Sequence, residues 1–316
     1  MPLTLGLLGT SATRPTVERN VPSVVLVREG ETLMFDCGEG TQRQMMRYGV
    51  SFALRDIYFT HMHADHVIGV IGLLRTMALQ GRTEPMRLLG PRGSARMLRR
   101  ARDFGVDRVT FPVEMIELEP MQRVEYRDHE VIAFPVDHGN TAALGYAMVE
   151  ATRKGRFNPE RARELGVPEG PLWGQIHRGQ PVTLADGRVI EPRELVGAAR
   201  AGRTVVITGD TRPCEATVEM ARNADLLLHE ATFTDEEAER AKETGHSTAR
   251  EAAGVAARAG VCRLVLTHIS ARYSHDPSDL LREAREVFSN VVVGRDGMEI
   301  DIPFRDAGDE SGASAT

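Results

Sequence analysis

Cysteine is scarce in this chain of 316 residues. Its three cysteines, Cys37, Cys214 and Cys262, are odd in number, far apart in the sequence and outside any Cys-x-x-Cys pair. A disulfide-stapled scaffold needs an even set of cysteines, and a thiolate zinc finger needs closely spaced pairs. The sequence therefore excludes both classes of domain and indicates a reducing compartment.

Long apolar runs are also missing. None approaches the roughly 18 residues that span a membrane, and the N-terminus has no basic stretch followed by an apolar one. We therefore expect a soluble, cytoplasmic protein without a membrane partner. Hydrophobic residues still make up 41% of the chain and charged residues 27%, which suits a globular protein with a sizeable core and excludes global disorder.

Lysine is almost absent, because Lys154 and Lys242 are the only two and arginine supplies the other basic residues. The net charge of −6 argues against general affinity for nucleic acids. Two segments are nevertheless basic: residues 87–108 contain seven arginines, and residues 153–178 contain five arginines and Lys154. Each segment is either a solvated helix face or a surface for a polyanionic ligand.

Short apolar runs alternate with turns and helical patterns along the whole chain. We expect strands at residues 3–8, 23–27, 32–36, 56–60, 86–90, 113–118, 124–126, 130–136, 144–150, 204–208, 226–229, 264–267 and 290–294. We expect helices at residues 41–48, 67–79, 93–104, 214–221, 235–243, 248–259 and 277–288, and the helix at 67–79 is apolar on all sides and should be buried. Two similar halves that mix strands and helices predict two sheets packed face to face with helices outside.

Two segments stand apart from this α/β pattern. Residues 152–187 are rich in glycine, proline and arginine, contain the only tryptophan and interrupt the succession of strands, so they are expected to form an insertion. Residues 306–316 are acidic and small, which predicts a disordered tail. The rest of residues 1–305 is expected to form one catalytic domain.

The strongest chemical feature is the run His61-Met62-His63-Ala64-Asp65-His66, directly after the strand expected at 56–60. In an extended segment His61 and His63 point to the same side and can bind one metal ion, while Asp65 and His66 can face a second. Imidazole and carboxylate ligands suit Zn²⁺, Mn²⁺ or Fe. The alternative is a polar loop that is rich in histidine by chance.

Three further candidates follow expected strands in the same way, namely His138, Asp210 and His268. A single residue of this kind is usually a cap or an ordinary polar side chain. Together with the four ligands of the first motif they supply seven, which suits two metal ions that share a bridging carboxylate. Two ions roughly 3.5–4 Å apart are suited to the hydrolysis of a phosphodiester or an ester.

This ligand pattern resembles that of the metallo-β-lactamase superfamily, and further motifs resemble ribonuclease Z, the endonuclease that cuts the 3′ trailer from precursor tRNA. The motifs are Gly9-Thr10-Ser11, Arg19-Asn20, Phe35-Asp36-Cys37-Gly38-Glu39-Gly40-Thr41-Gln42, Gly170-Pro171-Leu172-Trp173-Gly174, His229-Glu230-Ala231-Thr232, Gly245-His246-Ser247-Thr248 and Thr267-His268-Ile269-Ser270-Ala271-Arg272-Tyr273. The resemblance covers nearly the whole chain. It implies an αββα sandwich of two mixed sheets flanked by helices, with residues 152–187 as a protruding flexible arm that binds tRNA.

The resemblance also implies two Zn²⁺ ions per subunit, with Mn²⁺ or Fe as alternatives. The implied ligands are His61, His63 and His138 for one ion, Asp65, His66 and His268 for the other, and Asp210 as the bridge. Asp65 would also orient the attacking hydroxide. His246 would be the general acid for the leaving 3′ oxygen and Glu230 would orient it, although capping of the following helix is an alternative role for His246.

For the substrate, the resemblance implies precursor tRNA bound by a homodimer, and no protein partner is implied. Expected RNA contacts are Ser270, Arg272, Arg19 and the helix start at Thr41, with Lys154, Arg156 and Arg178 on the arm. The family often has lysine where this chain has Val17, which leaves the discrimination of the mature CCA end open. Cys37 is expected to be a small buried residue, and His129, His177 and His275 are expected at the surface.

Three other readings share parts of this pattern. The main alternative is another hydrolase of the same superfamily, such as a phosphodiesterase, an arylsulfatase-like enzyme or a thioester hydrolase that acts on small molecules. The basic insertion disfavours it. A non-catalytic RNA-binding relative is disfavoured because all seven ligands are present, and a flavodiiron protein because His63 stands where that branch has glutamate.

Overall fold

The computed structural model describes residues 2–305, which form two compact units. The larger unit consists of the chain up to Val149 and from Arg203 to Pro303, and the smaller unit consists of Glu150–Gly202 with Phe304 and Arg305. The acidic tail expected at 306–316 lies outside the described residues. In the described part of the chain, no helix is long and apolar enough to cross a membrane.

The first sheet of the larger unit has seven strands within the described residues. Their order is β16 (Glu299–Asp301), β1 (Leu3–Gly9), β2 (Ser23–Arg28), β3 (Glu31–Phe35), β4 (Asp56–Tyr58), β5 (Met86–Gly90) and β6 (Val113–Glu117). The first four strands pair antiparallel and the last four, from β3 onward, pair parallel. A tight turn with positive φ at Glu29 and Gly30 joins β2 to β3, as the Glu-Gly pair predicts.

The second sheet of the larger unit also has seven strands in the described chain. Their order is β15 (Val291–Val293), β14 (Leu264–Thr267), β13 (Leu226–Glu230), β12 (Thr204–Ile207), β9 (Leu144–Glu150), β8 (His129–Pro135) and β7 (Arg123–Glu125). The four strands from β15 to β12 are parallel, and β9 is antiparallel to β12. Both sheets are therefore mixed.

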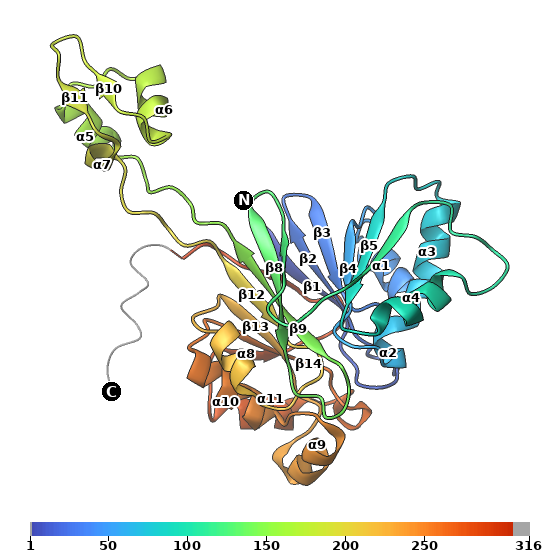
Figure 1. The fold of residues 1–316 in the computed structure, drawn as a ribbon. Helices are drawn as coiled ribbons and strands as arrows, with labels where there is room; N and C mark the ends of the chain where they lie inside the picture. Colours follow the sequence, from blue (N-terminus) through green and yellow to red (C-terminus); the bar gives the residue numbers. More distant parts are fainter. Residues whose placement is uncertain (1, 306–316) are drawn as a thin grey trace. The chain divides into compact units, whose positions relative to one another are not determined.

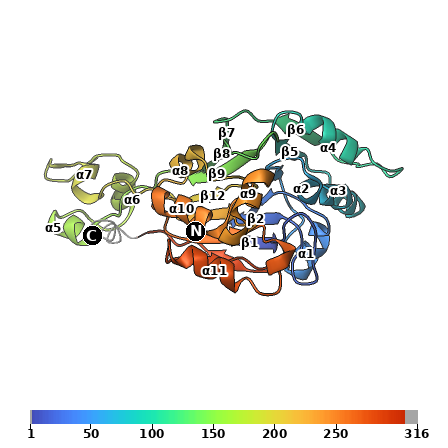
Figure 2. The same ribbon diagram turned by 90° about the horizontal axis from the view of Figure 1, so that it is seen from below.

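Helices cover the outer faces of the two sheets (Figures 1 and 2). The first sheet carries α1 (Thr41–Arg47), α2 (Ala64–Val67), α3 (Gly69–Leu79) and α4 (Ser94–Arg102). The second carries α8 (Glu215–Met220), α10 (Ala249–Ala259) and α11 (Ser278–Arg285), with η1 (Asp235–Glu237), α9 (Ala238–Thr244) and η2 (Ala271–Tyr273) in its connections. The expected αββα sandwich is confirmed.

The core follows from the alternation of side chains along each buried strand. In β13, Leu226 and Leu228 belong to the cluster between the two sheets, whereas Leu227 belongs to the cluster under α8, α10 and α11. In β4, Tyr58 faces the other sheet and Ile57 faces the helices of its own side. Because both faces of these strands are buried, their sequences are continuous apolar runs.

The segment 67–79 is not buried on all sides, so that expectation is wrong. The helix is interrupted, with α2 ending at Val67 and α3 beginning at Gly69. One face of α3 packs on the sheet, but Ile68 is 49% exposed and Leu79 is 89% exposed. Their spacing of 11 residues, or three helical turns, places both on the same side of the helix.

The smaller unit has its own apolar core. It contains α5 (Pro159–Glu164), α6 (Pro171–His177), β10 (Val182–Thr183), β11 (Val189–Ile190) and α7 (Pro192–Leu195), with Trp173 and other apolar side chains packed between them. The unit extends to Gly202, beyond the end of the insertion expected at 152–187. The difference arises because β11, α7 and the returning segment belong to the same packed element.

Two extended segments, residues 150–157 and 196–202, form the base of the smaller unit and run antiparallel. Arg153 pairs with Arg200, and Phe157 pairs with Val196. Between these pairs the backbones touch closely, since a Cβ atom on Gly155 would lie 1.8 Å from the carbonyl oxygen of Gly197. Glycine at position 155 is therefore required by space.

Candidate active site

The candidate ligands converge at one edge of the larger unit because each follows the carboxyl end of a strand. The His61–His66 loop follows β4, His138 follows β8, Asp210 follows β12 and His268 follows β14. Since β12, β13 and β14 are parallel, the loops after them meet at the same edge of the sheet. The structure thus brings together residues that are more than 200 positions apart.

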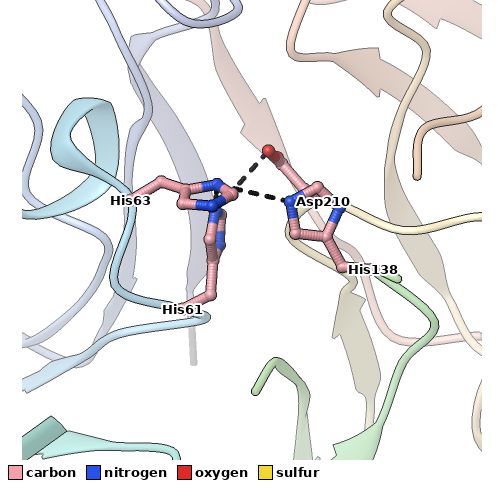
Figure 3. A group of neighbouring side chains, drawn as sticks. All are labelled: His61, His63, His138 and Asp210. Carbon is pink, nitrogen blue, oxygen red and sulfur yellow. Dashed lines mark hydrogen bonds and ion pairs between the residues drawn. The ribbon is translucent and has the colours of Figure 1, made fainter. Parts of the chain in front are cut away.

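The first group consists of His61, His63, His138 and Asp210, whose potential ligand atoms all lie within 4.8 Å of one another. Nδ1 of His63 is 2.9 Å from Nε2 of His61 and 3.3 Å from Nε2 of His138. Figure 3 shows the three imidazoles and the Asp210 carboxylate pointing to a common centre. His63 is exposed to solvent, whereas the other three are buried.

The second group consists of Asp65, His66 and His268. Oδ2 of Asp65 lies 3.6 Å from Nε2 of His66 and 3.6 Å from Nε2 of His268. Asp210 stands between the two groups, because its Oδ1 is 3.4 Å from His66 Nε2 and its Oδ2 is 3.3 Å from His268 Nε2 and 3.7 Å from His61 Nε2. This is the position that a bridging carboxylate requires.

The outward-facing ring nitrogen of four of these histidines is held by a neighbouring group. Nδ1 of His66 bonds to Oδ2 of Asp36 at 2.8 Å, and Nδ1 of His138 bonds to the carbonyl oxygen of Gly245 at 2.8 Å. Nδ1 of His61 lies 3.0 Å from the Thr60 hydroxyl and Nδ1 of His268 lies 2.9 Å from the Thr232 hydroxyl. Such contacts fix the tautomer and the ring orientation of metal-binding histidines.

Several inward-facing atoms have no hydrogen-bond partner although they are buried. They are Nε2 of His66, Nε2 of His268 and Oδ1 of Asp210. Unpaired buried polar atoms are costly, and three that converge on one point indicate a ligand that would satisfy them. Nitrogen and carboxylate oxygen donors in this number fit divalent ions such as Zn²⁺, Mn²⁺ or Fe²⁺.

The charges around these groups agree with that fit. Burial raises the pKa of Asp65 and Asp210, but the neighbouring histidines outweigh it and hold both carboxyl pKa values below their usual range. Burial lowers the pKa of His61 and His63, which favours the neutral imidazole that a metal ion needs. Burial acts in the same direction at His66, but the Asp210 and Asp36 carboxylates outweigh it and raise the pKa, so a metal ion would have to displace the proton of that ring. The backbone is also unusual here, since Asp36 and His268 both adopt a positive φ that non-glycine residues rarely take.

His246, which is half-buried, and Glu230, which is fully buried, form a pair beside the two groups. Nδ1 of His246 lies 2.7 Å from Oε1 of Glu230. Burial lowers the pKa of His246, but the Glu230 carboxylate outweighs it and raises the pKa to about 9. The cap of α10 is Thr248, whose side chain accepts from the amide of Glu251, so His246 does not have the capping role.

Asp65 is held by the loop between β1 and β2. The backbone amide of Thr13 donates to Oδ2 of Asp65 at 2.9 Å, and Thr13 has a φ of 61°. This conformation is uncommon for a β-branched residue and turns the amide toward the carboxylate. Thr13, Asp36, Thr60 and Thr232 were not predicted as site residues, although Asp36 and Thr232 lie in motifs that carry the family resemblance.

Arg19 does not reach the surface, which corrects its expected role as a phosphate contact. The side chain is buried, and its guanidinium donates to the carbonyl oxygens of Ser274 and Gly294 at 3.2 and 2.6 Å and to the Thr10 hydroxyl at 2.8 Å. Arg19 therefore ties the loop after β1 to the C-terminal part of the unit.

Thr41 is likewise not free to contact a phosphate. Its side chain is fully buried, its hydroxyl donates to the carbonyl oxygen of Gly38 at 2.8 Å, and its amide donates to the same oxygen at 3.2 Å. In contrast, Ser270 is partly exposed and Arg272 is exposed, with Arg272 Nη1 2.8 Å from Oε1 of Glu237. Both lie within four residues after His268 and remain candidates for substrate binding.

The basic segments differ in how their charges are paired. On α4, Arg96, Arg99 and Arg100 share the exposed face opposite the buried Leu98 and have no ion pair within residues 2–305. Their spacing of three and four residues forms one row. In the smaller unit Lys154, Arg156 and Arg178 are exposed. Arg161 and Arg163 are exposed as well and pair with Glu164 and Glu169.

Two remaining expectations concern residues outside the candidate centre. Cys37 is fully buried, and burial raises the pKa of its thiol to about 12, so it is an inert packing residue. His129 is also buried, stacked on Tyr126 with a centroid separation of 4.4 Å, which corrects its expected surface position. His177 and His275 are exposed.

Comparison with known proteins identifies the family of this chain. A protein-family model described as Beta-lactamase superfamily domain matches residues 175–269, and a family model described as Anti-Pycsar protein Apyc1 matches residues 3–146. The chain is similar to Ribonuclease Z of Gemmatimonas aurantiaca (64% identical over 303 residues, 96% of each chain) and of Myxococcus xanthus (53% over 305 residues, 96% of this chain and 99% of that protein). The structure of human tRNase Z, short form, matches with a TM-score of 0.70 at 28% identity, covering 95% of this chain and 100% of that one. With identities of this order over nearly its whole length, the chain belongs to the ribonuclease Z family.

Proposed function

We propose that this protein is a zinc-dependent endoribonuclease that removes the 3′ trailer from precursor tRNA and leaves a 3′-hydroxyl on the tRNA. The proposal rests on one combined observation. Asp210 stands between two ligand groups, and the Glu230–His246 pair lies beside them, in a chain that belongs to the ribonuclease Z family. Membership of this family supports precursor tRNA as the substrate, and the side-chain geometry supports hydrolysis as the reaction.

His61, His63 and His138 would hold one ion, Asp65, His66 and His268 the other, and Asp210 would bridge them. When bound, two divalent ions would polarise the scissile phosphate and lower the pKa of bound water. The Asp65 carboxylate, held by the Thr13 amide, would orient the attacking water and accept its proton. The carboxylate is suited to this role because it accepts hydrogen bonds and cannot donate them when ionised.

His246 would supply the proton to the leaving 3′ oxygen. Because Nδ1 is bonded to Glu230, Nε2 is the ring nitrogen available for donation. The raised pKa keeps the ring protonated near neutral pH, as a general acid requires. After the transfer, the phosphate would stay on the trailer and the hydroxyl on the tRNA.

The RNA would be bound by surfaces outside the catalytic centre. Ser270 and Arg272 would contact a phosphate near the cleaved bond, and Lys154, Arg156 and Arg178 would bind the tRNA body from the smaller unit. Their exposure supports this role. The free arginine row on α4 offers a further polyanion-binding surface, although the chain as a whole carries a net charge of −6.

A homodimer is part of the proposal, with the outer face of α3 as its interface. Ile68, just before α3, and Leu79, at its end, are 49% and 89% exposed and lie on the same side of the helix. Large exposed apolar side chains favour cover by another protein surface. Sedimentation of the wild type and of Leu79→Glu tests this, because a dimer through α3 should become a monomer in the variant.

Incubation of a 3′-extended tRNA transcript with the purified protein tests the activity. A gel should show one cut at the 3′ side of the tRNA, which disappears with chelator and returns with Zn²⁺. Asp210→Ala is the matched control and should give no cut. If the transcript stays intact under all metal conditions while small esters are hydrolysed, the proposal is wrong and the protein is a hydrolase of small molecules.

A further inference from the structure

Thr232 joins two parts of the candidate site that the proposed mechanism treats separately. This buried residue lies two positions after Glu230. Its hydroxyl is 2.9 Å from Nδ1 of His268 and 2.7 Å from Oε2 of Glu230. The other oxygen of Glu230 is 2.7 Å from Nδ1 of His246. A continuous path of hydrogen bonds therefore runs from His268 through Thr232 and Glu230 to His246.

The direction of each bond in this path follows from the chemistry of the groups. Both oxygens of Glu230 receive backbone amides, Oε1 from Thr211 at 3.0 Å and Oε2 from Thr232 at 3.1 Å, which fits an ionised carboxylate. The Thr232 hydroxyl must therefore donate its proton to Oε2. One of the two lone pairs of the hydroxyl then accepts the Nδ1 proton of His268, which leaves the lone pair of His268 on Nε2.

That lone pair faces the candidate metal centre. Nε2 of His268 is buried without a hydrogen-bond partner and lies 3.3 Å from Asp210 and 3.6 Å from Asp65. A threonine hydroxyl that is free to rotate would not select a tautomer. Here the carboxylate fixes the hydroxyl and the hydroxyl fixes the imidazole, so the charge of Glu230 determines which nitrogen of His268 is available.

The same arrangement occurs in the other half of the sandwich. The Thr60 hydroxyl is 2.8 Å from Oδ2 of Asp36 and 3.0 Å from Nδ1 of His61, and Oδ2 of Asp36 is also 2.8 Å from Nδ1 of His66. In each half, a buried carboxylate orients one histidine directly and a second one through a threonine. The recurrence favours a role in orientation over a chance contact at Thr232.

We infer that the Thr232 hydroxyl is a positioning group that couples His268, in the proposed metal centre, to the Glu230–His246 pair. The inference rests on the proposed function for the roles of these histidines. Thr232→Val keeps the shape and the backbone amide of the residue but removes the hydroxyl. His268 then loses the acceptor that fixes its tautomer, and Glu230 loses one of its four hydrogen bonds.

Retention of metal by the purified holoprotein tests the first half of the inference. Protein loaded with Zn²⁺ is exposed to increasing EDTA, and the metal that remains bound is measured by elemental analysis. Thr232→Val should release one of its ions at about 10- to 100-fold lower EDTA than the wild type, the usual effect of removing such a partner. Thr232→Ser, which keeps the hydroxyl, should behave as the wild type.

Thr217→Val is the matched control, because Thr217 is a fully buried threonine on α8 whose hydroxyl contacts Cys214. It should lower thermal stability without changing metal release. If Thr232→Val releases metal as the wild type does, or if Thr232→Ser is as weak as Thr232→Val, the positioning role of the hydroxyl is refuted. This readout is independent of RNA cleavage, so it remains decisive even if the RNA substrate is wrong.

A double-mutant cycle tests the second half, the coupling to His246. Single-turnover cleavage of precursor tRNA is measured at saturating Zn²⁺ for Thr232→Val, His246→Ala and both together. If Thr232 acts through Glu230 on His246, Thr232→Val should slow the wild type by a larger factor than it slows His246→Ala. Equal factors in the two backgrounds would overturn the coupling.

Discussion

Nδ1 of His246 and Oε1 of Glu230 are 2.7 Å apart, which leaves Nε2 as the only ring nitrogen of His246 that can serve a substrate. Glu230 in turn is buried and accepts two backbone amides, so its position does not depend on the histidine. The fixed Glu230 carboxylate therefore orients the His246 imidazole. Because a general acid matters only when the leaving group needs a proton, substrates with different leaving groups test the role of His246.

We expect His246→Ala to keep its metal content and its affinity for precursor tRNA but to lower the single-turnover cleavage rate by roughly 10²–10⁴-fold, the usual contribution of a positioned general acid. The loss should be much smaller with bis(p-nitrophenyl) phosphate, because p-nitrophenolate leaves without a proton. Rates on both substrates measure this. An equal loss on the two would remove His246 from the catalytic mechanism.

The wild type should contain close to two transition-metal ions per chain, because the seven ligands form two groups and Asp210 stands between them. Asp210→Ala should lose most of both ions, since Asp210 approaches His61, His66 and His268 within 3.3 to 3.7 Å. Elemental analysis of both proteins provides the measurement. A wild type with a single tightly bound ion would contradict the account of two metal ions.

Removal of the smaller unit should separate RNA binding from chemistry. The amide of Asn158 donates to the carbonyl oxygen of Leu195 at 2.7 Å, so a short Gly-Gly turn can replace the residues between them. We expect this variant to bind precursor tRNA weakly while hydrolysing bis(p-nitrophenyl) phosphate nearly as the wild type does. Equal loss of both activities would show that the unit is needed for the fold of the centre.

The arginine row on α4 should contribute to RNA affinity through charge alone. Replacing Arg96, Arg99 and Arg100 together by glutamine should weaken binding and reduce the slope of log affinity against log salt by up to about three, one for each lost phosphate contact. Hydrolysis of the small diester should stay unchanged.

The matched control for this row replaces three exposed arginines that already have carboxylate partners, Arg123, Arg258 and Arg282. Their replacement by glutamine removes the same total charge from the chain. If both triple variants show the same loss of affinity for precursor tRNA and the same reduction of the salt slope, the effect comes from net charge and α4 is not a contact surface.

The Cys37 thiol should stay unreactive in the folded protein. Burial raises its pKa to about 12, so the folded state keeps this proton as pH rises above about 8.5, where an unfolded thiol loses it. Stability should therefore fall with rising pH above that value, and less so in Cys37→Ala. Alkylation at pH 8 should label the exposed Cys262 first and Cys37 only after unfolding, and fast labelling of native Cys37 would contradict its burial.

The fold could be predicted from the sequence because its strands are buried on both faces and so stand out as short apolar runs. The elements β5, β9 and β14 begin and end at the predicted residues. The seven ligand candidates were identifiable because histidine and aspartate are conspicuous directly after such runs. The short strand β16 was missed, because Glu299–Asp301 has a single buried apolar residue between two exposed acids.

The errors at the site have a common physical cause. Arg19 was expected to contact a phosphate, and the helix start at Thr41 was expected to offer backbone amides to one. Contacts from positions far along the chain bury Arg19, including one with Gly294. Thr60 and Thr232 were not predicted as site residues because nothing in the sequence distinguishes them from other threonines. A threonine gives no chemical indication in the sequence, and its role depends on which carboxylate and which imidazole lie on its two sides.

The close contact of Gly155 with Gly197 has a consequence for how this chain can change in length over evolution. The two segments at the base of the smaller unit are paired on both sides of that contact, at Arg153 with Arg200 and at Phe157 with Val196. An insertion or deletion in one segment alone would shift one backbone against the other and place a side chain where only glycine fits. We therefore expect changes in length at the turn between β10 and β11, around Gly187, or as matched pairs in both segments.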